Sequence, residues 1–253
     1  MNIKSPEPRD YPRLRAIWKE AFSDGDSFLD YFWAHAFSPS RARCLYLDGE
    51  PAAALYWFDC EYGGGRVAYL YAIATAVKHR GRGLCTALLE DTHRHLSTLG
   101  YVAAMLVPAS EKLFDYYHTR GYRVCTYINE YRAERVETPI ELFLIDVTEY
   151  SLLRRKFLPE NSVIEEGPCL SLLSEGATLY KGNGLLLACR KTGSSLYAIE
   201  LLGDSSASGG ILNFLDCETG IFHTPWGIKP FSMIYDLSGG AVHPPEYFGL
   251  ALD

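Results

Sequence analysis

Residues 69–89 read YLYAIATAVKHRGRGLCTALL, and this stretch decides the fold. It begins with an apolar run, Tyr69–Thr75, rich in aromatic and β-favouring residues, which predicts a buried strand. A basic turn that contains Gly81 and Gly83 follows, and from Leu84 onward leucines recur at helical spacing. The sequence therefore predicts a strand, a glycine turn and a helix in that order.

This order favours binding of an anion where the helix begins. The first four amides of a helix have no partner within it, and the helix dipole adds partial positive charge there. Gly81 and Gly83 have no Cβ, so an anion could approach the backbone closely, and the turn also carries Lys78, Arg80 and Arg82. The spacing is neither that of a Walker loop nor that of a GxGxxG dinucleotide fingerprint. A tight connection with solvated basic residues is the alternative interpretation.

The turn resembles the signature of the GCN5-related N-acetyltransferase (GNAT) family, [Q/R]-x-x-G-x-[G/A]. Gly81 and Gly83 match, and Lys78 takes the first position, where Gln or Arg is usual. In that family the loop amides bind the pyrophosphate of acetyl-CoA, and the preceding strand pairs with the pantetheine arm. The resemblance implies acetyl-CoA as co-substrate and no metal. It places Ile73, Ala74 and Thr75 along the arm, and Arg80, Gly81, Arg82, Gly83, Leu84, Cys85 and Thr86 around the phosphates.

A second motif, YYHTRGY at Tyr116–Tyr122, is similar to the same family. It matches the pattern Phe/Tyr-Tyr-x-x-x-Gly-Phe/Tyr at every fixed position. In the family the second tyrosine often returns a proton to the leaving thiolate, and the resemblance implies this catalytic role for Tyr117. A phenol suits the role because it is a neutral donor at pH 7. The alternative is a core tyrosine with a satisfied hydroxyl.

Composition sets broader limits. At 253 residues, 48% of them hydrophobic, the chain can form one large domain or two modest ones. A formal net charge of −7 without a dominant basic face argues against nucleic acid as a partner and favours an amine-bearing one. The seven cysteines form no C-x-x-C motif, which indicates a reducing compartment. No signal core and no apolar run near the ~20 residues of a membrane span are present, so we expect a soluble, cytoplasmic protein without a membrane partner.

The first half reads as two helices, a three-stranded meander, the loop helix and a second buried strand. Its second helix, Phe28–Ala36, is unusually aromatic, which indicates either core packing or a wall of an acceptor pocket. The second buried strand, Tyr101–Val107, is parallel in the family's fold to the strand before the loop. His93 and His95 are expected on the surface of the loop helix rather than as a metal pair. The predicted class is α+β: a GNAT fold with a mixed sheet flanked by helices.

The resemblance covers Ile3 to about Tyr131, and the predicted domains are residues 1–135 and 136–253. The tetrapeptide LYAI occurs at Leu70–Ile73 and again at Leu196–Ile199, each time after a hairpin and a glycine turn, which suggests a duplication. The second copy is followed by no basic glycine loop, and Asp204 would repel phosphate. A degenerate, smaller GNAT-like domain is therefore expected, with a sterol-carrier-like domain as the alternative. Residues 165–168 read as a loop, and 211–215 as a short helix.

The last residues of the chain stay apolar, which predicts that the C-terminal end is tied down. In relatives that resemble the mycobacterial enhanced-intracellular-survival acetyltransferase, the terminal carboxylate acts as the base. The resemblance implies that role for Asp253. The alternative is a packed terminus with a solvated Asp253, in which case the base would be Glu61, Asp59 or a water.

The function that these motifs indicate is acetyl-CoA-dependent N-acetylation of a small-molecule or peptide amine by direct attack. A CoA-binding or sensor module without turnover is the main alternative. A nucleotide-phosphate enzyme is disfavoured because no Mg²⁺-holding set of Asp and Ser follows the loop. The sequence leaves open the identity of the amine and the formation of a homo-oligomer.

Overall fold

The computed structural model describes residues 1–22, 24–240 and 242–252. The chain divides into two compact units. Unit 1 consists of Met1–Leu106, Ser110–Arg123 and Ile234–His243, and unit 2 of Val107–Ala109, Val124–Met233 and Pro244–Asp253. Apart from Val107–Ala109, unit 2 thus begins at Val124, and a late segment of the chain, Ile234–His243, belongs to unit 1.

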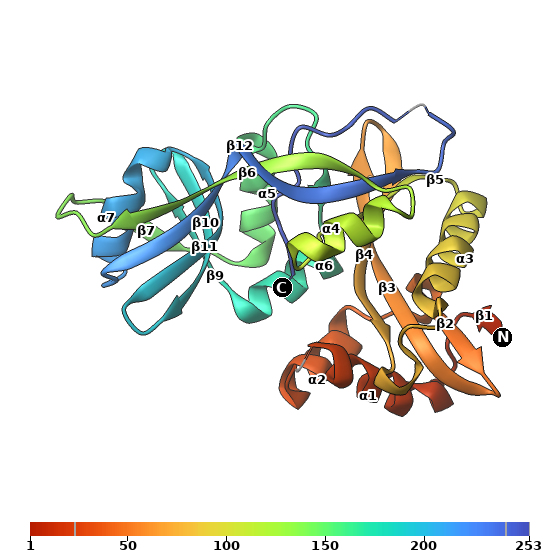
Figure 1. The fold of residues 1–253 in the computed structure, drawn as a ribbon. Helices are drawn as coiled ribbons and strands as arrows, with labels where there is room; N and C mark the ends of the chain where they lie inside the picture. The colour runs from red at the N-terminus through yellow and green to blue at the C-terminus, as the bar shows by residue number, and fades with distance from the viewer. Residues whose placement is uncertain (23, 241, 253) are drawn as a thin grey trace. The chain divides into compact units, whose positions relative to one another are not determined.

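Unit 1 is a mixed sheet with helices on both faces. Its strands lie in the order β1-β2-β3-β4-β5, and the end of β12 lies beside β5. In Figure 1, α1 and α2 lie together on one side of β3 and β4, and α3 lies on the other. The element bounds are β1 Asn2–Lys4, α1 Tyr11–Phe22, α2 Asp26–His35, β2 Ala42–Leu47, β3 Glu50–Tyr62, β4 Gly65–Thr75, α3 Leu84–Thr98, β5 Tyr101–Leu106 and α4 Glu111–His118, with 3-10 turns η1 Pro8–Asp10, η2 Pro39–Arg41 and η3 Val77–His79.

The first hairpins follow from their turn residues. Asp48 and Gly49 have φ angles of 50° and 85° between β2 and β3, and Gly63 and Gly64 have 58° and 76° between β3 and β4. Consecutive left-handed residues match the right-handed twist of the paired strands, and Asp and Gly adopt this conformation at low cost. The antiparallel meander predicted from these turns is confirmed.

β4 is irregular at Ala72, shortly before the glycine turn. Ala72 has φ 48°, and the pairing of β4 with β3 shifts its register there, between Ala54 and Tyr56. The parallel pairing of β4 with β5 starts at Arg66 and ends at Tyr69, which is opposite Met105. Among the described residues, the part of β4 after Tyr69 is bonded to β3 but not to β5. The two parallel strands thus separate just before the glycine turn.

One aromatic residue of α2, Phe32, belongs to the core of unit 1. Phe32 and Trp18 are each 1% exposed, and their ring centroids are 4.7 Å apart. The ring of Trp18 also lies 5.2 Å from Tyr56 of β3 and 5.5 Å from Tyr71 of β4. The first of the two interpretations of this helix, core packing, therefore accounts for Phe32.

Unit 2 has the same succession of elements as unit 1: a strand, two helices, an antiparallel meander, a helix and a parallel strand. Its sheet order is β12-β11-β10-β9-β7, with β6 paired to β12. β7 pairs antiparallel with β9, and β11 pairs parallel with β12. The bounds are β6 Arg123–Glu134, β7 Leu142–Leu144, α5 Val147–Phe157, β8 Ile164–Glu165, α6 Pro168–Gly176, β9 Thr178–Gly182, β10 Leu185–Thr192, β11 Ser195–Gly203, η4 Ser205–Ala207, α7 Ser208–Phe214 and β12 Thr219–Asp236.

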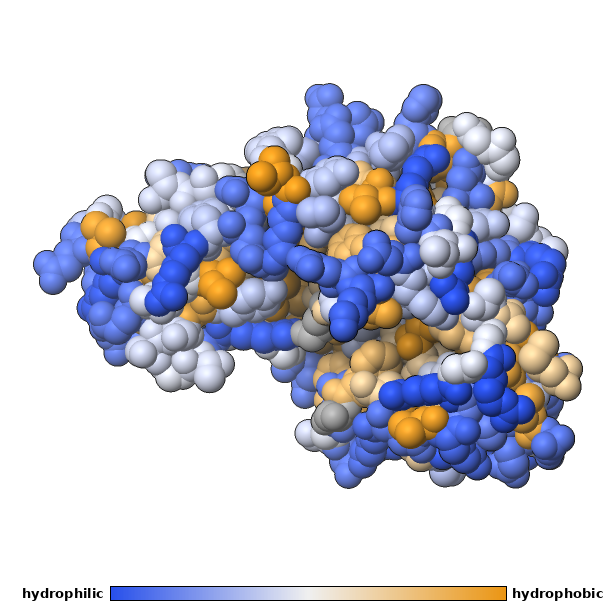
Figure 2. Space-filling model, in the orientation of Figure 1, coloured by the Kyte–Doolittle hydropathy of each residue, from blue (hydrophilic) through white to orange (hydrophobic). Residues whose placement is uncertain are grey.

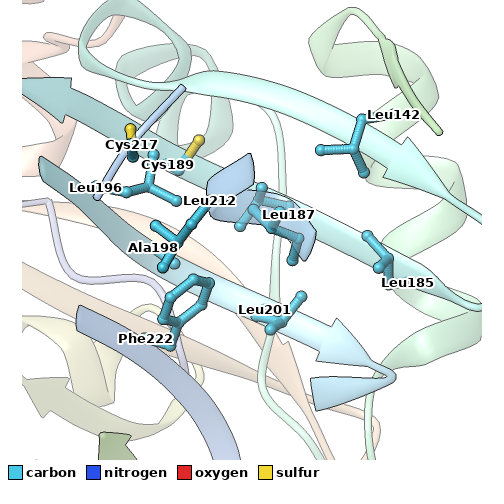
Figure 3. Packing of buried hydrophobic residues seen from close by; sticks show 11 residues of the cluster. Leu142, Leu185, Leu187, Cys189, Leu196, Ala198, Leu201, Leu212, Cys217 and Phe222 are labelled. Atoms are coloured by element: carbon cyan, nitrogen blue, oxygen red, sulfur yellow. The ribbon is translucent and has the colours of Figure 1, made fainter. Parts of the chain in front are cut away.

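Two predictions for this half are corrected. Residues 165–168 are not simply a loop, because Glu165 ends β8 and Pro168 begins α6. The short helix predicted at 211–215 is α7, which begins earlier, at Ser208. The core of unit 2 is an aliphatic cluster between the meander and α7, shown in Figure 3. Its members are Leu142, Leu185, Leu187, Cys189, Leu196, Ala198, Leu201, Ile211, Leu212, Cys217 and Phe222.

The C-terminal segment is packed, as predicted, as far as the structure describes it. Tyr247, Phe248 and Leu250 are fully buried, and Leu252 is nearly so. None of the described helices is long and apolar enough to cross a membrane. On the face drawn in Figure 2 the surface is mainly hydrophilic, and apolar residues form separate patches.

Candidate active site

The glycine turn between β4 and α3 is open to an approaching ligand. Gly81 and Gly83 both have φ 74°, and a Cβ built on either would meet no atom within 4 Å. The left-handed conformation explains why both positions are glycine, and the open space means that no neighbouring side chain fills the turn. The backbone of this turn is therefore accessible at both glycines.

The helix α3 begins directly at this turn. Gly83 is its N-cap, no side chain caps it, and the first amide bonded back to the turn is that of Ala87, 3.1 Å from the Gly83 oxygen. The amides of Leu84, Cys85 and Thr86 precede that bond and have no partner within the helix. With the helix dipole, they form a positive end that suits a phosphate group.

The basic side chains of the turn have different roles. Arg80 folds back on the turn: its Nε lies 3.1 Å from the carbonyl oxygen of Thr75, and Nη2 lies 3.3 Å from that of Glu20. Glu20 in turn accepts a hydrogen bond from the amide of Val77 at 2.8 Å. Arg80 therefore shapes the turn, whereas Lys78 and Arg82 are exposed and supply positive charge around it.

The strand before the turn offers one edge of its backbone. Ala54 and Ala53 of β3 pair with Ala74 and Thr75, so that one side of this part of β4 is satisfied. The other side is the edge that β5 leaves after Tyr69. An extended ligand could pair there along Ile73, Ala74 and Thr75 as an additional strand does.

Tyr117 lies on α4 and is 8% exposed. Burial raises the pKa of its hydroxyl well above the usual value, and the neighbouring Cys85 and Tyr116 add to the shift. The hydroxyl makes no hydrogen bond to any residue that the structure describes, so the alternative of a satisfied core hydroxyl is not what the structure has. The group stays protonated at neutral pH and remains free to donate.

A polar cluster connects the start of α3 with α4. The Cys85 thiol and the Tyr116 hydroxyl are hydrogen-bonded, and burial raises the pKa of both, that of Tyr116 to about 12. Arg120 lies 3.4 Å from the centre of the Tyr116 ring, and its Nε lies 2.9 Å from the hydroxyl of Thr86. The side chains of Cys85 and Thr86 thus hold α4 against the turn, whereas their backbone amides have no partner within α3 and could bind a ligand.

His93 is buried, so its predicted surface position is wrong. The imidazole is 7% exposed, its Nε2 lies 2.7 Å from the Tyr122 hydroxyl, and its ring stacks on Tyr235 with centroids 3.9 Å apart. Burial lowers the pKa of His93 to about 4, and Arg94 adds to the shift. The position could have been read from the sequence, because His93 lies four residues after Leu89 and three before Leu96, on one helix face.

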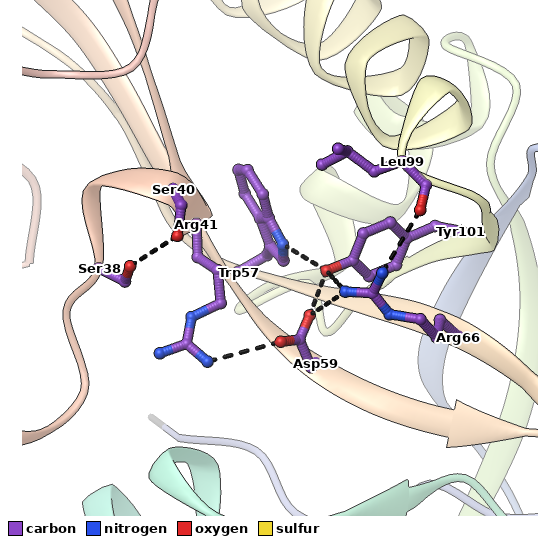
Figure 4. Close-up of polar contacts among 8 residues, drawn as sticks. All are labelled: Ser38, Ser40, Arg41, Trp57, Asp59, Arg66, Leu99 and Tyr101. Atoms are coloured by element: carbon purple, nitrogen blue, oxygen red, sulfur yellow. Dashed lines mark hydrogen bonds and ion pairs between the residues drawn. The ribbon is translucent and has the colours of Figure 1, made fainter.

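Asp59 is engaged in a polar cluster of its own, shown in Figure 4. Its carboxylate accepts the hydroxyl hydrogen of Tyr101 and pairs with Arg66 at 3.4 Å and with Arg41 at 3.5 Å. Asp59 is opposite Ala68, four residues before the irregularity at Ala72 and thus roughly 13 Å away along the strand. These partners and this distance do not favour Asp59 as the catalytic base. Asp253, the other candidate, lies outside the described residues.

The corresponding turn of unit 2 is crowded where its helix begins, although Asp204 and Ala207 line a pocket beside it. It runs from β11 through η4 to α7, and the Asp204 carboxylate accepts the amide of Ser206 at 2.9 Å. A Cβ on Gly209 would lie 2.7 Å from a methyl of Val136, and one on Gly210 would lie 2.7 Å from Ile140. The amide of Val136 also donates to the Gly209 oxygen at 3.1 Å. The segment before β7 therefore covers the start of α7, where unit 1 keeps an open turn.

Comparison with known proteins agrees with this geometry. Residues 2–125 match the family model described as "Acetyltransferase (GNAT) domain". The chain is similar in structure to a GCN5-related N-acetyltransferase from Anabaena variabilis, with 16% identity and a TM-score of 0.72 over 93% of this chain and 72% of that one. It is also similar to Eis1 from Mycobacterium abscessus, with 13% identity and a TM-score of 0.70 over 95% and 75% of the two chains.

A GCN5-related N-acetyltransferase from Kribbella flavida gives 13% identity and a TM-score of 0.69, over 94% of this chain and 71% of that one. Comparison with curated protein sequences gave no match. At these identities the structural likeness shows a shared fold, and the family rests on the matched residues 2–125 and on the two motifs within them. Residues 2–125 therefore match an acetyltransferase domain of the GNAT family in sequence, and the chain shares its fold with GNAT structures.

Proposed function

We propose that this chain transfers an acetyl group from acetyl-CoA to the amino group of a small molecule or peptide. The observation that carries the proposal is the open turn at Gly81 and Gly83, which lies between the free edge of β4 and the uncapped start of α3. A pyrophosphate fits such a turn because backbone amides and the helix dipole both face it. The family whose model residues 2–125 match supports an acyl group as the transferred unit.

Different residues would hold different parts of the co-substrate. The amides of Gly81 to Thr86 would bind the phosphates, with Arg82 and Lys78 as outer positive charges. The backbone of Ile73, Ala74 and Thr75 would pair with the amide-bearing arm, since that edge is free of β5. Arg80 would act indirectly, by fixing the turn through the oxygens of Thr75 and Glu20.

In this proposal Tyr117 protonates the leaving thiolate. Its hydroxyl is protonated at neutral pH, has no competing hydrogen bond among the described residues, and lies on the helix that Arg120 and Tyr116 hold against the turn. Acetyl-CoA supplies an activated thioester, so the amine can attack directly without a covalent enzyme adduct. The chain must only orient the two reactants and move two protons.

The proton that the amine loses needs an acceptor, and we propose Asp253 for it. Its side-chain carboxylate can attract an ammonium group and accept its proton. The engagement of Asp59 with Arg66, Tyr101 and Arg41 supports this choice over Asp59. The net charge of −7 also favours a cationic acceptor over nucleic acid.

We further propose that unit 2 is a degenerate copy of unit 1 that no longer binds the co-substrate. The repeated succession of elements supports a duplication, and the coverage of α7 by Val136 and Ile140 supports the loss of its phosphate site. A sterol-carrier-like origin is not needed to account for this succession.

A ligand panel tests the proposal. The melting temperature of the full chain is measured with acetyl-CoA, CoA, ATP and NAD, and we expect stabilisation by the first two alone. Release of free thiol with a panel of amines then separates an enzyme from a CoA-binding sensor. Stabilisation by ATP or NAD but not by CoA would reject the acetyltransferase function, and binding without thiol release for any amine would favour the sensor.

A further inference from the structure

Unit 2 contains a buried ionic cluster of one arginine and two glutamates. Arg154 of α5, Glu165 of β8 and Glu200 of β11 are 2%, 1% and 0% exposed. Arg154 Nε lies 2.8 Å from Glu200 Oε2, and its Nη2 lies 2.9 Å from Glu200 Oε1 and 2.8 Å from Glu165 Oε2. Two carboxyl groups thus share one guanidinium, and if both were ionised the interior would hold an excess negative charge. Such a charge is costly in a dry interior, so one proton is expected in the cluster.

The hydrogen bonds indicate which glutamate carries that proton. Glu200 accepts both bonds from Arg154 and two more from the hydroxyls of Tyr150 and Tyr247, at 2.7 and 3.1 Å. Glu165 accepts from Arg154 and from the amide of Leu250, and its Oε1 is buried without a partner among the described residues. Four donors stabilise the ionised form of Glu200, whereas an unpartnered buried oxygen favours the neutral form of Glu165.

The same two glutamates hold the C-terminal segment, residues 244–252. Tyr247 donates to Glu200, and the amide of Leu250 donates to Glu165. The segment also pairs with the chain before β8, where the amide of Val163 lies 2.9 Å from the Tyr247 oxygen. The backbone passes so close to the Tyr247 ring that a Cβ on Gly249 would lie 2.0 Å from its hydroxyl oxygen. Two hydrogen bonds of this buried segment, those of Tyr247 and Leu250, are therefore made to the ionic cluster.

We infer that the Arg154–Glu165–Glu200 cluster positions the C-terminal segment through a single proton on Glu165, and that loss of this proton loosens the segment at Leu250. Without the proton, two carboxylates face one guanidinium, and the repulsion is relieved by movement of the segment whose Leu250 amide is bonded to Glu165. The charged or titratable groups that face Glu165 are Arg154 of α5, Glu200 of β11 and Tyr247 of the segment itself.

The pH range follows from the environment of Glu165. Burial raises the pKa of Glu165 from 4.5 to about 8; Glu200 adds to the shift, and Arg154 and the Leu250 amide oppose it. Because the folded pKa lies above the unfolded one, the stabilisation by neutral Glu165 is complete below about 4.5 and is lost as the pH rises to about 8. The pKa values of Arg154 and Tyr247 are raised well above their usual values, so neither group titrates in this range.

The Arg154–Glu165–Glu200 cluster affects catalysis if Asp253 acts as the base, as proposed above. Leu252, the last described residue, is buried and directly precedes Asp253, so the docked segment ends one residue before the proposed base. Glu165 and Arg154 are then positioning residues for the base and do not touch the reactants.

Hydrogen exchange of the full chain tests the cluster directly. Protection factors for a peptide that covers residues 246–252, normalised to the intrinsic rate at each pH, are measured from pH 6.5 to 9.5. In the wild type we expect protection to fall by about tenfold per pH unit up to about pH 8 and to stay constant above it. Glu165→Gln keeps the shape and the neutral charge of the protonated residue, so its protection should stay constant over the whole range. Glu166→Gln is the matched control, since the neighbouring Glu166 is paired with Arg155 at the surface, and it should behave as the wild type.

Constant protection in the wild type, or an unchanged pH dependence in Glu165→Gln, would overturn the inference. If that variant does not fold, carbon-13 NMR of the glutamate carboxyls in the wild type decides: one must titrate near pH 8, and titration of all glutamates below pH 6 contradicts the cluster. Turnover provides a separate readout. Its alkaline decline should be absent in Glu165→Gln, whereas a wild type without any turnover would reject the proposed function and leave the exchange result intact.

Discussion

The imidazole of His93 and the hydroxyl of Tyr122 lie 2.7 Å apart in the interior of unit 1, and this pair supports the tyrosine proposed as the acid. The Tyr122 ring packs at 66° against Tyr117, with centroids 5.7 Å apart. Tyr235 closes the other side, because it stacks on the imidazole at an angle of 16°. The orientation of the Tyr117 ring is thus set by a hydrogen-bonded pair that reaches into α3.

This pair makes the free energy of unfolding depend on pH. The pKa of His93 is about 4 in the folded chain and near 6.5 when unfolded, so the unfolded state binds more protons between these values. Stability should therefore fall as the pH drops from 6.5 to 4, by up to roughly 3 kcal/mol. Chemical denaturation at several pH values measures this fall. It should be reduced in His93→Phe and kept in His118→Gln, which changes an exposed histidine; an equal fall in both variants contradicts the assignment.

Gly83→Asp should abolish binding of acetyl-CoA. The carboxylate would lie at the open turn, where it would repel the pyrophosphate and where its Cβ would block the close approach. We expect at least ~100-fold weaker binding by titration calorimetry. Gly100→Asp is the matched control, because Gly100 has a similar φ of 79°, equally open space, and a place at the opposite end of α3. Equal affinities in the two variants would remove the phosphate site from this turn.

Tyr117→Phe should preserve binding and reduce turnover. The ring keeps its packing against Tyr122, and only the proton donor is lost, so kcat should fall by about 10²-fold or more while the affinity for acetyl-CoA stays within about threefold. Steady-state thiol release and calorimetry measure the two quantities. A variant with the full rate would show that water protonates the thiolate and that Tyr117 is a packing residue.

Removal of Asp253 alone should reduce the rate without unfolding the chain. Leu252 is buried and should be retained, since its loss would add a packing defect to the experiment. We expect an unchanged affinity for acetyl-CoA, a melting temperature within about 2 °C, and a lower kcat with a higher KM for the amine. Asp253→Asn removes only the acidic side-chain group and should lower kcat without a change in the length of the chain. Normal kinetics after the deletion would direct the search for a base to Glu61 or to water.

The parts of the fold that follow local rules could be predicted from the sequence. The turn at Asp48 and Gly49 needs two left-handed residues, and the loop at Gly81 and Gly83 needs them at an anion-binding helix start. Such requirements restrict residue identity strongly, so the meander and the candidate phosphate site can be predicted from the sequence. His93 is buried despite its polarity, because it lies on the same helix face as Leu89 and Leu96.

The structure of the second half is harder to predict from the sequence, because the contacts that stabilise its elements join residues far apart in the chain. β12 contains Pro225 and Pro230, which argue against a strand, and Trp226 has φ 60°. The strand persists because β6 lies against it: a Cβ on Gly227 would meet the carbonyl oxygen of Ile128 at 1.9 Å. Glu165 ends a strand instead of lying in the predicted loop. Its partner Arg154 is eleven residues earlier in the chain and can be identified as its partner only in three dimensions.

The return of residues 234–243 to unit 1 determines when that unit can be completed during synthesis. The amide of Leu237 bonds to the carbonyl oxygen of Val102 at 2.9 Å, so the edge of β5 is covered by a segment made more than a hundred residues later. Until that segment leaves the ribosome, the nascent chain presents β5 as an open edge, which is a template for pairing with other chains. A fragment cut after residue 125 would keep this edge open, so we expect it to associate with other chains more readily than the full chain does.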